Sequence, residues 1–149
     1  MPEIITQKIK IEAVCRDIFR ELIRWGQAEW WPKRSLMNIE NLDGPIDVGT
    51  RYRQQVKIPF GPHWCTVNKV IDKKNMYIRR DFLGGMFDGF EELSVVPDED
   101  GNGDVAYTFA AEVKGGVNKF LWQKAAKKMH TENINIILKT LKEYLEKKQ

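Results

Sequence analysis

The chain has few of the residues that define metal, redox and membrane proteins. It contains two cysteines, Cys15 and Cys65, and two histidines, His63 and His130, and the cysteine spacing matches neither a zinc knuckle nor a redox pair. No apolar run approaches the roughly 20 residues that a membrane-spanning helix needs. We therefore expect reduced cysteines in or near the core, no metal, no cofactor and no integral membrane association.

A strong charge of one sign is also missing. The 24 Lys and Arg residues nearly balance the 21 Asp and Glu residues, for a net charge of +3, and the lysines are dispersed, which argues against a nucleic-acid partner. Residues 1–11 alternate in polarity and lack the apolar block of a signal peptide. With 42% hydrophobic residues in 149, we expect a single cytoplasmic domain over residues 1–149 with its own core.

What the sequence does contain is a regular succession of strand and helix patterns. Residues 3–11 alternate as a half-buried strand does, and residues 12–24 repeat apolar positions every three or four residues, as a helix does before the stop signal Gly26. A second short helix or turn carries Trp30-Trp31-Pro32. Six further runs of strand length follow at residues 35–40, 50–58, 63–71, 75–82, 87–96 and 105–113. The short separators predict antiparallel neighbours.

Residues 118–148 have the apolar period of one long helix of about eight turns. One face carries Trp122, Ala126, Met129, Ile134, Ile137, Leu141, Tyr144 and Leu145. His130 and Asn133 lie on the same face, where an ordinary core helix would be apolar. A sheet of this size buries one face against such a helix and, because strands twist, curls around it. We therefore predict an α+β fold with a partly polar hollow between helix and sheet.

Several short motifs occur in the order of a known family. They are Trp30-Trp31-Pro32, Val48-Gly49-Thr50-Arg51, Gly84-Gly85, Leu121-Trp122 and the helix over residues 130–141. With these motifs, nearly the whole chain resembles the Bet v 1/START superfamily, and in particular its bacterial polyketide cyclase/dehydrase or lipid-transport-like (SRPBCC) members.

The resemblance implies the helix-grip fold, a seven-stranded curved antiparallel sheet wrapped around a long C-terminal helix in the order β-α-α-β-β-β-β-β-β-α. It also implies an elongated cavity, which relatives use for sterols, lipids, polyketides, quinones or plant hormones. It implies no shared catalytic residues, because this scaffold carries enzymes, carriers and sensors alike.

Inward positions supply the candidate ligand contacts, since alternation assigns one face of each strand to the interior. The predicted polar contacts are Tyr52, Gln54, Arg80, Tyr107, His130 and Asn133. The predicted apolar wall is Trp30, Val67, Ile78, Phe109, Trp122 and Met129. A structural role remains an alternative: His130 as a satisfied core histidine, and the tyrosines as packed residues with their hydroxyls at the rim.

Arg80 shares its strand parity with Ile78 and Phe82. If Arg80 points inward, it needs a carboxylate, from Glu91 or from an acidic ligand; a shifted strand would instead turn it to solvent. His63 follows a Pro-Phe-Gly-Pro turn and suits a strand edge. Both histidines with Glu91 make a poor metal site, because the spacing does not bring their side chains together as ligands.

Apolar residues are also unusually frequent in connecting segments. They are Trp30, Trp31, Met86, Phe87, Phe120 and Leu121. We hypothesise that they meet at the mouth of the cavity and act as a gate, with Gly84-Gly85 permitting movement. The alternative is a satellite cluster that seals one end of the core.

Three functions fit these patterns, and binding of a small hydrophobic molecule (a lipid, polyketide, quinone or aromatic metabolite) leads. The second is a polyketide cyclase or dehydratase in which His130 removes a proton next to a carbonyl while Tyr52, Tyr107 or Arg80 stabilises the enolate. No catalytic constellation is visible in the sequence to support it. The third is a protein-interaction domain with a filled interior and an exposed aromatic rim.

Overall fold

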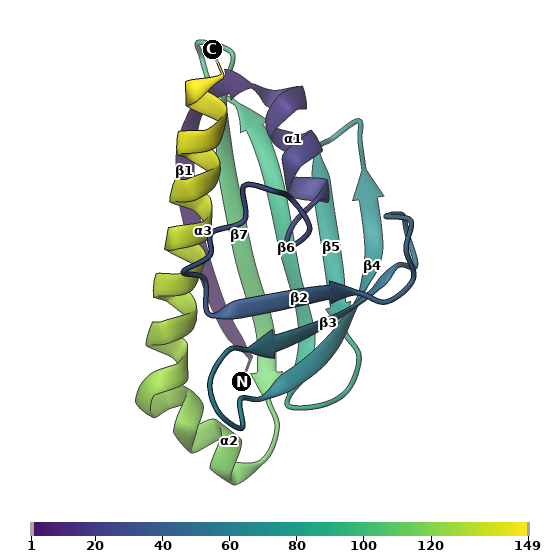
Figure 1. Cartoon of the computed structure of the whole chain (residues 1–149), viewed down its shortest axis with the longest axis vertical. Coiled ribbons are helices and arrows are strands. Elements are labelled where there is room, and N and C mark those ends of the chain that lie inside the picture. Colours follow the sequence, from purple (N-terminus) through teal and green to yellow (C-terminus); the bar gives the residue numbers. More distant parts are fainter. Residues whose placement is uncertain (1, 149) are drawn as a thin grey trace.

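A single curled sheet of antiparallel strands forms the centre of the computed structural model, which describes residues 2–148 (Figure 1). The strands are β1 (Glu3–Val14), β2 (Met37–Asn41), β3 (Arg51–Val56), β4 (His63–Asp72), β5 (Tyr77–Phe82), β6 (Phe87–Pro97) and β7 (Asn102–Val113). Their order in the seven-stranded sheet is β1-β7-β6-β5-β4-β3-β2. Strands β2 to β7 therefore pair with their sequence neighbours, as the short separators predicted, and β1 pairs with β7.

The C-terminal helix lies along β1 and covers the open side of the curled sheet (Figure 1). It consists of α2 (Gly116–Leu121), the π-helical turn η1 (Trp122–Ala126) and α3 (Lys127–Lys147). Ile134, Ile137, Leu141 and Leu145 are buried, as predicted. The π turn was not foreseen; its wider spacing interrupts the α-helical stripe between α2 and α3. Within residues 2–148, no helix is long and apolar enough to cross a membrane.

Side-chain hydrogen bonds fasten α3 to both ends of the sheet. Oδ1 of Asn133 accepts a hydrogen bond of 2.8 Å from the backbone N–H of Leu36, just before β2. On the other side, Nε2 of Gln7 on β1 donates to the carbonyl of Thr131 at 3.4 Å. Because β1 and β2 are the two edge strands, α3 bridges the opening of the sheet and closes the helix grip. The predicted fold class is confirmed.

The helix α1 (Cys15–Ile23) packs against β6 and β1. It ends before Gly26, whose φ is +80° and where a Cβ would lie 2.6 Å from the Cβ of Ile39, so only glycine fits this turn. Of the helix or turn predicted next, the structure has the turn: residues 24–36 form turns and bends, so the second α in the predicted order is wrong. Gly26 and Pro32 leave too few residues between them for a helix, and Trp30 is held by a 3.0 Å hydrogen bond from Nε1 to Glu21.

Strand parity decides which side chains reach the interior. Tyr52 and Gln54 of β3 are buried, as predicted. In β4 the register pairs Tyr52 with Thr66, so Thr66 faces inward and Val67, opposite Arg51, lies on the outer face. The prediction that Val67 lines the interior is therefore wrong. In this part of β4 the more polar residues face inward, whereas an assignment by hydrophobicity alone turns Val67 inward and Thr66 outward.

Candidate functional site

A cavity of about 400 Å³ lies between η1 and the start of α3 on one side and the β3–β4 hairpin and the β5–β6 turn on the other. Its walls are mostly apolar. They include Val56, Trp64, Met86, Phe87, Trp122 and Met129. The volume is within the range of small-molecule sites, at its lower end.

Aromatic rings form the floor of this cavity. The Trp122 ring stacks on Phe109 with centroids 5.1 Å apart, and Phe87 meets Trp122 edge-on at 5.5 Å. Trp64 in turn packs edge-on against Phe87 at 4.9 Å. These contacts connect η1 to strands β4, β6 and β7, and they give a ligand a preformed aromatic surface.

Three side chains in the cavity wall each carry a buried polar atom without a hydrogen-bond partner. They are Nε1 of Trp64, Nε1 of Trp122 and Nδ1 of His130. A buried polar group that is left unpaired costs about 1–3 kcal/mol. Because the three atoms are themselves buried, a ligand with acceptors for the two indole N–H groups and a donor for the histidine would remove this cost only after these side chains shift.

Behind the cavity, a buried polar network is centred on Glu91. Oε2 of Glu91 accepts a 2.8 Å hydrogen bond from the Tyr107 hydroxyl, and Oε1 accepts one of 3.0 Å from Nε2 of Gln54. Nη1 of Arg80 lies 3.8 Å from Oε1. Arg80 thus points inward and pairs with the protein's own carboxylate. Burial, together with the neighbouring Glu91, raises the pKa of Tyr107 well above its usual value, so its hydroxyl stays protonated.

Tyr107 also determines the tautomer of His130. Its hydroxyl hydrogen is donated to Glu91, so only an oxygen lone pair faces Nε2 of His130, 3.3 Å away. Nε2 therefore carries the ring hydrogen and donates it, while Nδ1 keeps a lone pair. Burial lowers the pKa of His130 to about 4. The ring is accordingly neutral at pH 7, with Nδ1 as a hydrogen-bond acceptor.

The structure divides the predicted site residues into three groups. Trp122, Met129, His130 and Asn133 line the cavity. Tyr52, Gln54, Ile78, Arg80, Tyr107 and Phe109 are buried in the interior but lie outside the cavity lining. The side chain of Asn133 is only partly available to a ligand, because its Oδ1 already accepts a hydrogen bond from the Leu36 N–H group. Glu91, considered from the sequence as a partner for Arg80 and as part of a poor metal site, is the centre of the polar network.

Trp30 and Val67 belong to the third group, away from the cavity. Val67 is on the outer face of the sheet. Trp30 packs near Tyr144 of α3, with ring centroids 6.5 Å apart, because the turns after α1 carry it to that end of the helix. The prediction that Trp30 lines the cavity wall is therefore wrong.

The proposed gate residues are divided in the same way. Met86, Phe87 and Leu121 line the cavity. Trp31 packs edge-on against Trp25 with centroids 5.1 Å apart, so the two tryptophans do not meet the others at the mouth. Trp30 belongs to the main hydrophobic core and Trp31 packs against it, so these two residues form neither the gate nor a separate satellite cluster.

Trp64 is the main cavity residue that sequence reasoning missed. It lies on the inner face of β4 with Thr66, and its register partner is Gln54. The parity that wrongly turned Val67 inward also turned Trp64 outward, so one error of alternation explains both. The signal that identifies Trp64 is its place opposite Gln54, which alternation in β3 assigns to the interior.

A second hollow, of about 720 Å³, lies between α1 and the β4–β5 turn. It is larger, but its rim carries Arg16, Arg20, Lys73 and Lys74. No residue that lines it is among those of residues 2–148 with an unpaired buried polar atom. The smaller cavity under η1 is therefore the better candidate for a specific ligand site.

Comparisons with known proteins find likeness in structure. No family model matches the sequence, and no curated protein sequence matches it. The solved structure of TTHA0849 from Thermus thermophilus is 19% identical, with a TM-score of 0.76 and 99% of each chain covered.

Two further matches are enzymes. A norcoclaurine synthase point mutant from Thalictrum flavum, solved with a transition-state analogue, is 14% identical with a TM-score of 0.77, and the match covers 100% of this chain and 98% of that one. The ZhuI aromatase/cyclase from Streptomyces sp. R1128 is 12% identical with a TM-score of 0.75, covering 98% and 94%. At these identities the likeness shows a shared fold.

Proposed function

Because the chain has the helix-grip fold of the Bet v 1-like proteins, we propose that it binds a small, mainly apolar molecule with one or two polar groups in the cavity under η1. The observation that carries this proposal is the presence of three unpaired polar atoms, on Trp64, Trp122 and His130, in otherwise apolar walls. Other buried atoms without a hydrogen-bond partner, on Gln7, Asn68, Arg80 and Asp98, lie outside the cavity lining, whereas these three line one cavity.

The walls also indicate the kind of ligand. Apolar burial supplies most of the affinity, at about 25 cal/mol per Å² before ordering losses. The cavity volume of about 400 Å³ favours a compact aromatic or quinone-like molecule over a long-chain lipid. An oxygen acceptor on the ligand suits the indole N–H groups of Trp64 and Trp122, and a ligand hydroxyl suits Nδ1 of His130.

A cyclase or dehydratase activity is the second candidate, and the chain of hydrogen bonds from Glu91 through Tyr107 to His130 favours it. This chain orients the imidazole and leaves Nδ1 free to accept a proton, as a general base requires. The pKa of His130, lowered by burial to about 4, argues the other way, since it makes the ring a weak base at neutral pH. Binding therefore stands ahead of catalysis.

Native mass spectrometry of freshly purified protein, with extraction of any retained molecule, tests for a ligand directly. In parallel, titration with the fluorescent probe 1-anilinonaphthalene-8-sulfonate measures the apolar site. Ala126→Phe should fill the cavity and lower probe affinity roughly tenfold or more. Ile23→Phe, in the second hollow between α1 and the β4–β5 turn, is the matched control. If Ile23→Phe lowers probe binding and Ala126→Phe does not, the site lies in the second hollow and the proposal is defeated.

Two further variants separate binding from catalysis once a retained molecule is identified. Trp122→Phe keeps the ring but removes the N–H group, so it should weaken binding of that molecule. If the protein is only a binder, the unmodified chain does not convert the retained molecule, and His130→Ala weakens binding of that molecule. If His130→Ala leaves the affinity unchanged and abolishes turnover, the protein is an enzyme with His130 as its general base.

A further inference from the structure

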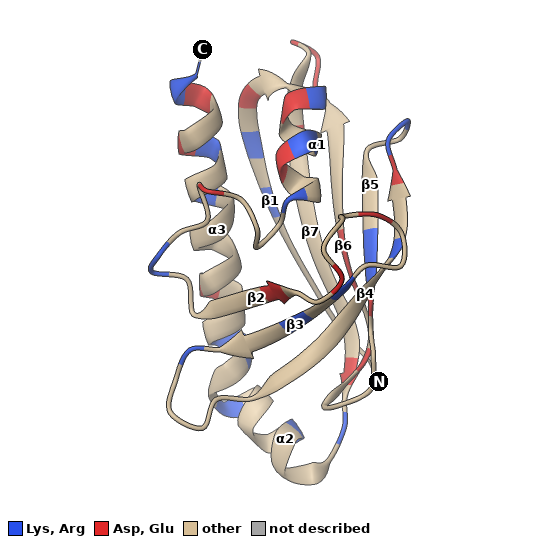
Figure 2. Ribbon diagram, turned by 45° about the vertical axis from the view of Figure 1, so that its right-hand side comes forward, with Lys and Arg blue, Asp and Glu red and all other residues tan. Residues whose placement is uncertain are grey.

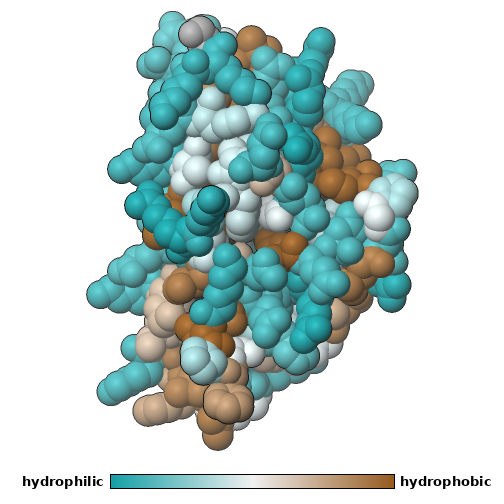
Figure 3. Space-filling model, viewed as in Figure 1, coloured by the Kyte–Doolittle hydropathy of each residue, from teal (hydrophilic) through white to brown (hydrophobic). Residues whose placement is uncertain are grey.

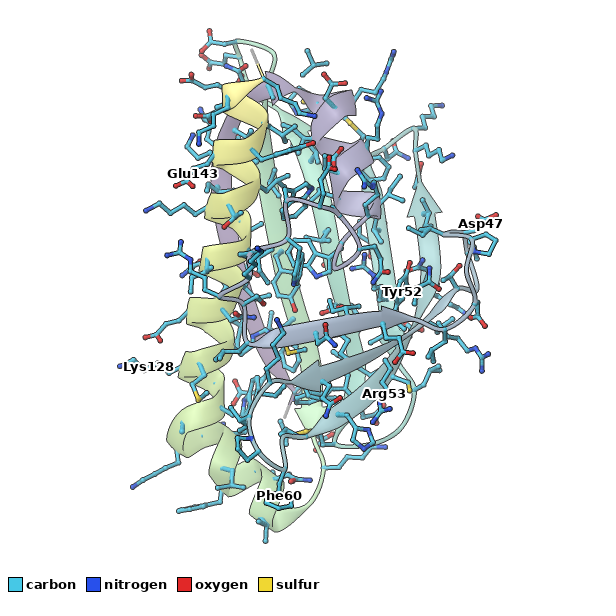
Figure 4. All side chains as sticks on the ribbon, viewed as in Figure 1. Asp47, Tyr52, Arg53, Phe60, Lys128 and Glu143 are labelled. Carbon is cyan, nitrogen blue, oxygen red and sulfur yellow. The ribbon has the colours of Figure 1, made fainter. Side chains whose placement is uncertain are left out.

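Exposed apolar side chains lie on segments that also contribute residues to the cavity lining. Three segments contribute them: the β3–β4 loop (residues 57–62), the β5–β6 turn (residues 83–86) and residues 114–126, which contain α2 and η1. The residues are Ile58, Phe60, Leu83, Val117, Phe120 and Leu121, between 45% and 105% exposed. Figure 3 shows brown and tan atoms gathered at the lower end of the molecule, where Figure 1 places α2 and Figure 4 labels Phe60.

The same segments carry positive charge and no negative charge. Lys57, Lys114, Lys119 and Lys124 are exposed, and the three segments contain no Asp or Glu. Within residues 2–148, none of these four lysines forms an ion pair. In Figure 2, α2 carries blue without red. The nearest carboxylates flank these segments: Asp88 faces Glu112 across β6 and β7, and Glu3 accepts a hydrogen bond from Gln123 of η1. The excess of cations therefore belongs to the three segments themselves.

We propose that this end of the molecule docks onto an anionic lipid surface. Phe60, Val117 and Phe120 project from two separate segments and suit insertion among acyl chains, while the lysines meet the headgroups. Each lysine near an anionic membrane adds attraction, and salt screens it. A second copy of the chain is a poor occupant, because its four lysines would face these four.

The proposal gives the cavity an orientation. Leu121 and Phe60 line the cavity and also belong to the exposed surface. Docking therefore brings the mouth of the cavity against the lipid, and an apolar molecule dissolved in a bilayer enters without crossing water. The docking surface does not depend on the proposed ligand, since membrane binding is measured without one.

Flotation of the full chain with lipid vesicles tests the docking surface. We expect binding to vesicles of phosphatidylcholine with one-third phosphatidylglycerol at low salt, weak binding to pure phosphatidylcholine, and release from the anionic vesicles at high salt. Val117→Ser with Phe120→Ser should lower the partition coefficient roughly tenfold or more. Lys119→Ala and Lys124→Ala should each lower it roughly fivefold. Neither Val117 nor Phe120 lines the cavity.

Matched controls lie elsewhere on the surface. Val48→Ser removes an apolar side chain that is 56% exposed in the β2–β3 loop, and Lys73→Ala with Lys74→Ala removes charge from the β4–β5 turn. These controls should bind vesicles as the unmodified chain does. Absence of binding to anionic vesicles, or equal losses in the control and test variants, overturns the proposal. Self-association that depends on Phe120 would assign the surface to a second copy instead.

Discussion

Tyr107 on β7 and His130 on α3 meet across the two layers of the fold, with 3.3 Å between the tyrosine hydroxyl and Nε2 of the histidine. Glu91 completes this contact by accepting the hydroxyl hydrogen at 2.8 Å. The sheet therefore determines which nitrogen of His130 is free at the cavity wall.

Tyr107→Phe should destabilise the protein through lost hydrogen bonds, with little change in packing. The substitution removes one hydroxyl and leaves Oε2 of Glu91 and Nε2 of His130 without this partner in a buried site. We expect a loss of about 1–3 kcal/mol in the free energy of unfolding, measured by urea denaturation. Tyr144→Phe, whose hydroxyl makes an exposed bond to Glu29, is the control and should change little. Equal effects of the two substitutions would contradict the buried network.

The stability of the protein should fall between pH 7.5 and pH 5. His130 has a pKa of about 4 in the fold, below its unfolded value near 6.5, because burial disfavours the charged ring. The unfolded chain therefore gains a proton in this window and the folded chain does not. This one group contributes a loss of about 2 kcal/mol by pH 5, and the loss ends below the folded pKa. Urea unfolding at both pH values measures it.

The control for this pH effect is His130→Asn, which should lose the corresponding part of the pH dependence. His63→Asn, at the exposed start of β4, should retain it. A pH dependence that survives in His130→Asn would show that other groups cause it.

Breaking the buried pair of Arg80 and Glu91 should be far more damaging than breaking an exposed one. Glu91→Gln leaves the Arg80 guanidinium without its counter-charge in the interior, and we expect a loss of about 3–5 kcal/mol. Arg80→Met in the same chain should recover part of it. Asp81→Asn, which breaks the partly exposed 2.7 Å pair with Arg79, should cost less than about 1 kcal/mol. Thermal unfolding of the four proteins gives the comparison.

Asn133→Leu should loosen β2 from α3. The change keeps the side-chain size but removes the acceptor for the Leu36 N–H group. We expect a loss of about 1–3 kcal/mol and faster hydrogen exchange at the Leu36 amide. Asn118→Leu serves as a control, since its side chain bonds locally to the carbonyl of Lys114. Unchanged exchange at Leu36 would show that Asn133 does not hold the edge strand.

Much of the fold follows from local patterns. Alternation in β1, β3 and β7, the helical period of residues 118–148 and the short turns predicted the fold class and the order of the strands along the chain. The same alternation predicted the inward direction of Tyr52, Gln54 and Tyr107. These features depend on residues close together in the chain. The exceptions are equally local in origin: Gly26 and Pro32 exclude the second helix, and β4 has a polar inner face that reverses its apparent parity.

The sequence by itself determined that a long amphipathic helix with His130 and Asn133 on its buried face would cover a curled sheet, because periodicity assigns faces. Only the tertiary structure decided where space remains, which atoms stay unpaired and that Glu91, Tyr107 and His130 join. Those outcomes depend on the register of strands far apart in the chain and on where α3 rests against them. The π turn at Trp122 and the bond from Leu36 to Asn133 set that position.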